Sequence, residues 1–280
     1  MREISVERIT EAIREMCMEA NYTLSPDMQE ALNKAQCTEE SPLGEEILSM
    51  LAQNLKVAKE EKIPICQDTG MAVVFLEIGQ DVHFTGGSLA DAVNRGVALG
   101  YEEGYLRKSV VKDPLIRENT NDNTPAVIHT EIVDGEHVKI TLTPKGFGSE
   151  NMSKVYMLKP ADGREGVKEK IVTAVKEAGP NACPPLVVGV GIGGTFEKCA
   201  LLAKKALLRE TGESHPDAHI AALEQEIRKE CNELGIGPAG LGGSNTVLAV
   251  HIETFATHIA GLPVAVNICC HVNRHCSREL

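Results

Sequence analysis

The pattern of apolar and polar positions divides the chain into a helical N-terminal stretch and a longer mixed region. Apolar side chains recur every three or four residues over residues 4–17, 25–35 and 44–60, which is the spacing of amphipathic helices. Ser25-Pro26 suits the start of the second helix, with the serine as cap and the proline at the first helical position. We therefore predict a helical lead-in over residues 1–62.

Beyond the lead-in, short apolar runs alternate with further helical stretches. The sequence predicts strands at 71–78, 126–133, 138–143, 184–190 and 261–270, and helices at 91–105, 163–178, 215–234 and after the glycine turn that opens 191–209. Asp134-Gly135 is typical of a hairpin turn, and the polar, Asn-rich stretch 116–125 reads as a loop. The predicted fold class is mixed α/β, with residues 63–280 joined to the lead-in as one domain over 1–280.

Composition and charge narrow the function classes. Of 280 residues, 42% are hydrophobic and 24% charged, as in globular proteins, and no apolar run is long enough to span a membrane. The N-terminus lacks the pattern of a signal peptide, so we expect a cytoplasmic protein. A net charge of −12 and only nine aromatic residues argue against nucleic-acid binding. An acidic chain that binds an anionic substrate must concentrate positive side chains locally.

Cysteines are the most informative residues for chemistry. Without a signal peptide a disulfide framework is not expected, which leaves metal binding or buried thiols. Cys66 lies in the polar turn PICQDTG and Cys183 in the proline-rich junction NACPP, and both settings suit a ligand more than a core residue. Four others lie in or at the ends of predicted helices and are interpreted as packed thiols: Cys17, Cys37, Cys199 and Cys231.

Two alternative sites fit the sequence less well. A zinc site could use four residues of the tail, although no C-x₂-C pair is present; these are Cys270, His271, His275 and Cys276. The glycines of 189–194 match the dinucleotide fingerprint, but two helical stretches follow where a second strand is required. Those glycines could still form an anion or cluster site before a helix.

An iron–sulfur site is the third interpretation of the cysteines. Three protein thiolates on a [4Fe–4S] cluster leave one iron open to act as a Lewis acid, whereas four thiolates suit electron transfer. Cys66, Cys183 and one of the Cys269–Cys270 pair could supply three such thiolates.

Six motifs in order extend over almost the whole chain: PICQDTG, LRKS, KGFGSENMS, NACPPLVVGVGIGGTFEK, GIGPAGLGG and VNICCH. On these motifs the chain resembles the alpha subunits of iron–sulfur (class I) fumarate hydratases and is similar to those of L-tartrate dehydratases. The resemblance implies a [4Fe–4S] cluster with one iron not ligated by protein, held by Cys66, Cys183 and Cys270. Cys269 leaves the choice of third ligand open.

The resemblance also implies roles for other residues and for partners. Gln67, Asp68, Arg107 and Gly148 would contact the substrate, and Asp68 and His258 would be catalytic. The implied activity is reversible hydration of fumarate to (S)-malate, with dehydration of L-tartrate to oxaloacetate as the alternative and a redox iron–sulfur protein as the alternative from another class. Single-chain relatives carry a further C-terminal domain, so we expect a separate beta subunit, an α2β2 heterotetramer and no membrane partner.

Overall fold

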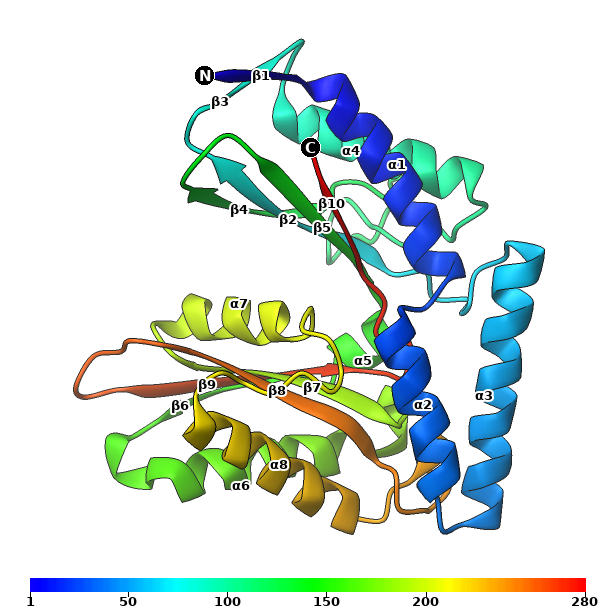
Figure 1. Ribbon diagram of the computed structural model, residues 1–280, viewed down its shortest axis with the longest axis vertical. Coiled ribbons are helices and arrows are strands. Elements are labelled where there is room, and N and C mark those ends of the chain that lie inside the picture. The colour runs from blue at the N-terminus through cyan, green and yellow to red at the C-terminus, as the bar shows by residue number, and fades with distance from the viewer. The chain divides into compact units, whose positions relative to one another are not determined.

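Each half of the mixed α/β fold is built on a four-stranded sheet (Figure 1). The computed structural model describes residues 1–280, which divide into two units. Unit 1 comprises Met1–Ser25, Asn54–Phe147 and Arg274–Leu280, and unit 2 comprises Pro26–Gln53 and Gly148–Asn273. The predicted fold class is confirmed, while the single catalytic domain over 1–280 stays a prediction.

In unit 1 the sheet has the strand order β10-β5-β2-β4, and β2 lies antiparallel to β5 and parallel to β4. These strands are β2 (Met71–Gly79), β4 (Val127–Val133), β5 (Val138–Lys145) and β10 (Cys276–Glu279). Helices α1 (Val6–Tyr22) and α4 (Leu89–Glu103) pack on each other, and α1 also packs on β5. Two short strands, β1 (Arg2–Ser5) and β3 (Val82–Thr85), pair in parallel.

The predicted hairpin around Asp134-Gly135 is wrong, although both of its strands form. The strands β4 and β5 do not pair, because β2 lies between them and bonds to both. The turn instead packs on the end of β2, where Gly79 N donates to His137 O and Asp81 N donates to Gly135 O. A second difference is that β9 is not the last strand, since β10 follows it and pairs with β5.

In unit 2 the strand order is β6-β9-β7-β8, with β7 antiparallel to β9 and parallel to β8. The strands are β6 (Lys154–Leu158), β7 (Leu186–Gly193), β8 (Val247–Phe255) and β9 (Leu262–Cys269). Helices α6 (Gly163–Ala178) and α8 (Ala218–Glu233) cover one face and α7 (Phe196–Ala206) covers the other (Figure 1). The buried core lies mainly between the sheet and the α6–α8 layer.

The remaining elements are short or belong to the N-terminal helical stretch. They are α2 (Pro26–Thr38), α3 (Pro42–Glu61), α5 (Phe147–Glu150), η1 (Pro160–Asp162), η2 (Gly179–Ala182) and η3 (Pro238–Gly240). Helix α2 begins at Pro26, as predicted. None of the helices combines the length and apolar composition that crossing a membrane requires.

The glycines of the apparent dinucleotide fingerprint serve packing within unit 2. Gly189 and Gly191 lie inside β7 and face α7, and a Cβ at Gly191 would lie 2.0 Å from Cys199 O. The N-terminus of α7 follows the C-terminal end of β7, whereas Cys183 precedes the other end of that strand. The glycine turn therefore forms no anion or cluster site beside Cys183.

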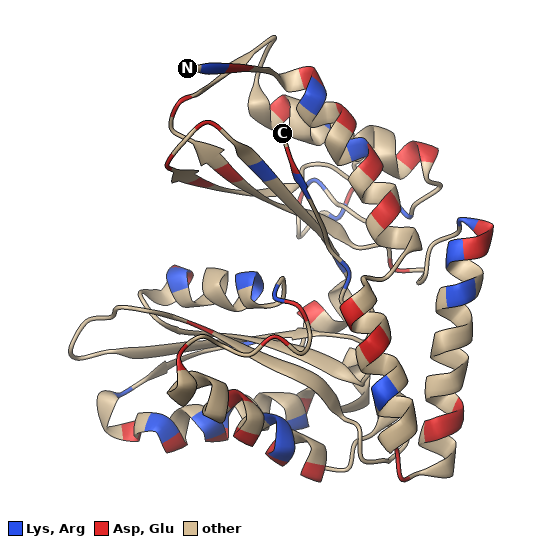
Figure 2. Ribbon diagram, viewed as in Figure 1, with Lys and Arg blue, Asp and Glu red and all other residues tan.

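Charged side chains lie mainly on the helices. Figure 2 shows residues of both signs along α6 and α8, while most strand residues are uncharged. Exposed ion pairs of this kind contribute little to stability. The net charge of −12 is thus distributed over the surface, and a bound dianion must be neutralised by particular side chains.

Candidate functional site

The first part of the candidate site is the PICQDTG turn of unit 1, which joins α3 to β2. Cys66 is half-buried there. The main-chain N–H of Asp68 donates to Cys66 Sγ at 3.4 Å, and the thiol lies 3.4 Å from Gln67 Oε1. These two contacts fix the direction of the Cys66 side chain within the turn.

Asp68 ties this turn to the chain that follows β5. Its Oδ1 accepts from Gly70 N at 3.0 Å and its Oδ2 accepts from Phe147 N at 2.9 Å. The Asp68 carbonyl in turn accepts from the guanidinium of Arg274. Both carboxylate oxygens therefore help to hold the turn, and each keeps a second lone pair for another donor.

Arg107 is held beside the same turn through Thr69. The Thr69 hydroxyl accepts from Arg107 N at 2.9 Å and donates to Arg107 O at 3.2 Å. The Arg107 side chain is exposed and makes no ion pair with the chain's own carboxylates. The structure thus brings together four of the predicted residues in unit 1: Cys66, Gln67, Asp68 and Arg107.

Two buried residues that the sequence did not indicate, Tyr101 and Asn123, bind main-chain groups of the turn. The buried Tyr101 hydroxyl lies 2.7 Å from Thr69 O and 3.0 Å from Gly70 O. Burial raises the Tyr101 pKa, so the hydroxyl stays a donor. Asn123 is fully buried, donates to Gly70 O and accepts from Ser109 N. The polar Asn-rich loop is thus ordered and takes part in building the site.

The second part of the candidate site is the pair Cys183 and Cys270 in unit 2. Cys183 ends η2 just before β7, and Cys270 follows β9. Val187 lies opposite Cys269 in the antiparallel ladder, so both cysteines lie at the same end of the sheet. His271 connects the two junctions, because its main-chain N donates to Cys183 O at 3.4 Å and its Nδ1 lies 3.1 Å from the same oxygen.

Burial distinguishes the two neighbouring cysteines at this end of the sheet. Cys269 is the last residue of β9 and is only 5% exposed. Cys270 is half-buried and Cys183 is exposed. Successive residues of a strand face opposite sides of the sheet, so at most one of the pair can face Cys183.

Gly148 lies near this pair as well. It belongs to the short helix α5, and the nearest neighbour of a Cβ at this position would be Asn181 O, at 3.9 Å. Asn181 precedes Cys183 by two residues. A larger side chain at Gly148 would therefore extend toward the chain that carries Cys183.

His258 lies elsewhere in unit 2. It occupies the exposed loop between β8 and β9, where its Nδ1 accepts from Ala260 N at 3.1 Å. This loop is at the opposite end of β9 from Cys270, a separation of about 23 Å at the rise of a β-strand. His258 lines a hollow of about 490 Å³ between that loop and the starts of α6 and α8.

The remaining cysteines fall into two groups. Cys17, Cys199 and Cys231 are buried in helices, and burial raises the pKa of the Cys231 thiol to about 12. Their interpretation as packed thiols is confirmed. Cys37 is exposed near the end of α2, so the same interpretation is wrong for Cys37.

The zinc interpretation of the tail finds no support in the side-chain positions. Cys276 lies in β10, its Sγ donates to Met16 O at 3.6 Å, and burial raises its pKa to about 12. No three side chains of His, Cys, Asp or Glu gather in the chain where they could hold a metal ion.

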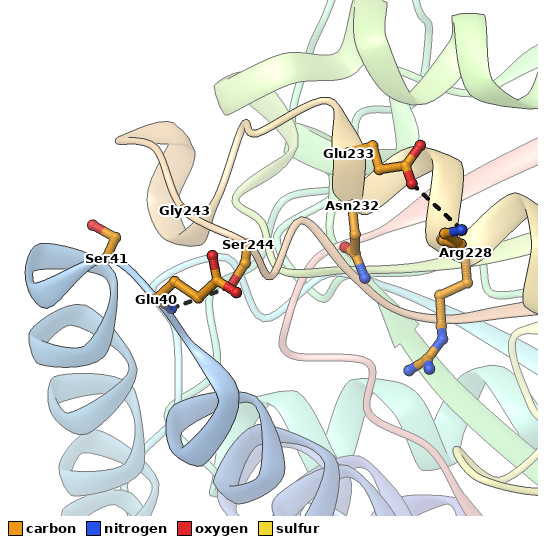
Figure 3. A pocket seen from close by; sticks show the side chains of 8 residues that line it. Glu40, Ser41, Arg228, Asn232, Glu233, Gly243 and Ser244 are labelled. Atoms are coloured by element: carbon orange, nitrogen blue, oxygen red, sulfur yellow. Dashed lines mark hydrogen bonds and ion pairs between the residues drawn. The ribbon is translucent and has the colours of Figure 1, made fainter.

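A hollow of about 690 Å³ lies in unit 2 beside the last turns of α8 (Figure 3). Its lining residues are Glu40, Ser41, Arg228, Lys229, Asn232, Glu233, Gly243 and Ser244. Two cations and two carboxylates are among these residues, and Lys229 pairs with Glu233 at 3.8 Å. None of the candidate residues lines this hollow, and its charges balance, so it has no preference for a dianion.

Comparison with known proteins gives matches over nearly the whole chain. A family model described as fumarate hydratase (fumerase) matches residues 10–279. A Methanocaldococcus jannaschii protein named "Putative L(+)-tartrate dehydratase subunit alpha" is 41% identical over 280 residues, covering 98% of each chain. L(+)-tartrate dehydratase subunit alpha from Escherichia coli K12 and from Shigella sonnei are each 31% identical over 273 residues, covering 96% of this chain and 90% of the relative.

Proposed function

The chain belongs to the fumarate hydratase family, and we propose that it is the alpha subunit of an iron–sulfur hydro-lyase that interconverts fumarate and (S)-malate. The observation that carries the proposal is the pairing of Cys183 and Cys270 at one end of the unit 2 sheet, joined through His271. Cys66 supplies a third thiol in a turn that also presents Gln67, and Arg107 is held beside this turn through Thr69.

The three thiols suit a [4Fe–4S] cluster in type and exposure. Each lies in a turn or junction and is at least partly exposed, and none forms a disulfide. Three ligands would leave one iron open, and such an iron acts as a Lewis acid toward a hydroxyl group. We propose Cys66, Cys183 and Cys270 as the three protein ligands of this cluster.

The polar residues around Cys66 would bind and orient the substrate. Arg107, exposed and without an ion pair, can bind one carboxylate through two parallel N–H donors. The Gln67 amide can donate to a second oxygen of the substrate. Asp68 is fixed by Gly70 and Phe147, so its carboxylate can accept a proton or orient a water with little loss of entropy.

The separation of about 23 Å along β9 argues against His258 acting on a cluster held by Cys183 and Cys270 of its own chain. We therefore propose that His258 serves a site in a second copy of the chain. Two-fold assemblies place loops of one copy against the other, and the exposed loop between β8 and β9 could make such a contact.

L-tartrate is the second candidate substrate, and the names of the relatives favour it. The matched proteins from E. coli and S. sonnei are named as L(+)-tartrate dehydratase subunits. Tartrate differs from malate by one hydroxyl group. A site that binds this hydroxyl discriminates strongly against the substrate that lacks it, because its own polar groups would stay unpaired.

The matched variants Cys270→Ser and Cys269→Ser test the cluster assignment. After anaerobic reconstitution with iron and sulfide, we expect Cys270→Ser to lose most of its iron and Cys269→Ser to keep it. Turnover of fumarate, malate and L-tartrate with the partner subunit then identifies the substrate. Equal iron binding by both variants and the parent chain would overturn the ligand assignment.

Co-expression of two inactive variants tests the role of His258. If His258 serves a second copy, a dimer of one His258→Ala chain and one Cys66→Ser chain contains one complete site. About half of the dimers in a random mixture are such hybrids, so we expect about a quarter of the parent activity. No recovery would contradict a role in a second copy, and full activity of His258→Ala alone would remove His258 from the site.

A further inference from the structure

Arg274 is a buried cation whose chemistry the proposed function does not use. It is 4% exposed and is the only arginine among the buried residues. Its Nε donates to Pro144 O at 3.3 Å and its Nη2 donates to Asp68 O. Its Nη1 is buried without a hydrogen-bond partner, and no carboxylate pairs with the guanidinium.

An unpaired buried charge is costly. The contrast is Arg209, whose side chain is 10% exposed and pairs with Glu224 and Glu253. The Asp68 carboxylate bonds to Gly70 and Phe147, and it is the Asp68 carbonyl that accepts from the guanidinium. Arg274 thus forms no ion pair within the chain, and one edge of its guanidinium has no partner.

The two carbonyls that Arg274 binds belong to segments in direct contact. Asp68 lies two residues after Cys66, and Pro144 lies near the end of β5. Gly70, with φ of +76°, approaches this strand end so closely that a Cβ would lie 2.8 Å from the backbone of Pro144 and Lys145. Arg274 therefore joins the turn that carries Cys66 to the strand end that leads to Gly148.

The path through Asp68 also limits the distance between Arg274 and Cys66. The Asp68 N–H lies 3.4 Å from Cys66 Sγ, and the carbonyl of the same residue accepts from Arg274. The guanidinium is thus within about 9 Å of the sulfur.

We propose that Arg274 is a positioning residue that fixes the Cys66 turn against the end of β5 and supplies positive charge toward a cluster bound there. The charge part rests on the proposed function, since three thiolates on a [4Fe–4S]²⁺ core give a net negative group. The positioning part concerns the chain alone.

Arg274→Met and Arg274→Lys test the two parts, with Arg278→Met as the matched control. Arg278 lies four residues further along the same segment and pairs with Glu15 and Glu19 instead of the Cys66 turn. Hydrogen–deuterium exchange of residues 66–70 in the cluster-free chain measures positioning. We expect about tenfold faster exchange in both Arg274 variants, with unit 2 unchanged, and no local change in Arg278→Met.

The midpoint potential of the reconstituted cluster measures the charge. We expect a lower potential in Arg274→Met, because an added electron is less well stabilised, and a near-parent potential in Arg274→Lys. Parent-like exchange at residues 66–70 in both Arg274 variants would overturn the positioning role, and an unchanged potential in Arg274→Met would overturn the charge role. If the parent chain binds no cluster, the proposed function fails while the exchange experiment still decides the positioning role.

Discussion

At the scale of single residues, Glu39 makes more hydrogen bonds than any other carboxylate of unit 2. It follows α2, and its two side-chain oxygens accept from the main chain of Ser41, Ser244 and Asn245 and from the Asn245 side chain. These bonds outweigh the effect of partial burial and lower the Glu39 pKa from its ordinary value of 4.5 to about 2. One carboxylate therefore fixes the glycine-rich loop that precedes β8.

Glu39→Gln should destabilise the chain in a pH-dependent manner. Because the folded pKa lies below the unfolded one, Glu39 contributes its full stability above about pH 4.5 and loses it as pH falls toward 2. We expect the variant to lose about 1–3 kcal/mol of unfolding free energy at pH 7, a range that allows for solvent screening. Between pH 7 and pH 3 the stability of the variant should fall less than that of the parent chain. Denaturant unfolding at pH 3 and pH 7 measures this.

The neighbouring Glu40→Gln is the control for that experiment. The Glu40 carboxylate makes no ion pair or hydrogen bond within the chain, so its removal should change stability by less than about 0.5 kcal/mol. Equal losses for the two variants at pH 7 would contradict the role given to Glu39.

The residues of the candidate site differ in how visible they are in the sequence. Cys66 and Cys183 stand out because polar turns and proline junctions are unusual places for a thiol. Tyr101 and Arg274 do not stand out, because they act through main-chain carbonyls of segments far away in the sequence. Such carbonyls have no sequence signature, so only the folded chain identifies these partners.

At the scale of elements, local signals predicted the helices better than the strand pairing. Helix α2 begins at Pro26 as predicted, and Ser88 caps α4 by accepting from Asp91 N. The predicted Ser25 cap is wrong, because Ser25 Oγ is buried without a hydrogen-bond partner. Strand pairing depends instead on residues far apart in the sequence. In the pairing of β2 with β4, for example, Val73 lies opposite Val127. A hairpin signal such as Asp134-Gly135 predicts a turn but cannot exclude a third strand between its arms.

A substitution at the contact between α7 and β7 should destabilise unit 2. Gly191→Ala would place a Cβ 2.0 Å from Cys199 O, so either α7 or β7 must move. We expect a loss of more than about 2 kcal/mol of unfolding free energy, with the largest rise in hydrogen exchange in α7. Thermal or urea unfolding of the purified variant measures it.

Gly261→Ala is the control for Gly191→Ala. The nearest neighbour of a Cβ at Gly261 would be 3.8 Å away, an ordinary contact distance. Its stability should stay within about 0.5 kcal/mol of the parent chain. A Gly191→Ala chain as stable as Gly261→Ala would show that α7 is not in close contact with β7 in solution.

At the scale of the whole molecule, the proposed residues are divided between the two units, and Arg107 is the exposed basic side chain among them. Unit 1 carries Cys66 and Arg107, and unit 2 carries Cys183 and Cys270. Arg107 can neutralise one carboxylate of a C4 dicarboxylate, and the other must be neutralised from elsewhere. The names of the relatives as alpha subunits imply a partner that could supply the second group.

The isolated chain should therefore bind iron but turn over little substrate. All three proposed thiolates belong to this chain, so reconstitution should give about four iron atoms per chain with or without the partner. Turnover of fumarate should appear only when the partner subunit is added, because both substrate carboxylates must be bound for the carbon–carbon double bond to be positioned. Iron analysis and fumarate consumption, measured on the same anaerobic samples, separate the two properties. Full turnover by the pure chain would show that it contains every group the reaction needs, and iron binding only with the partner would place a ligand outside this chain.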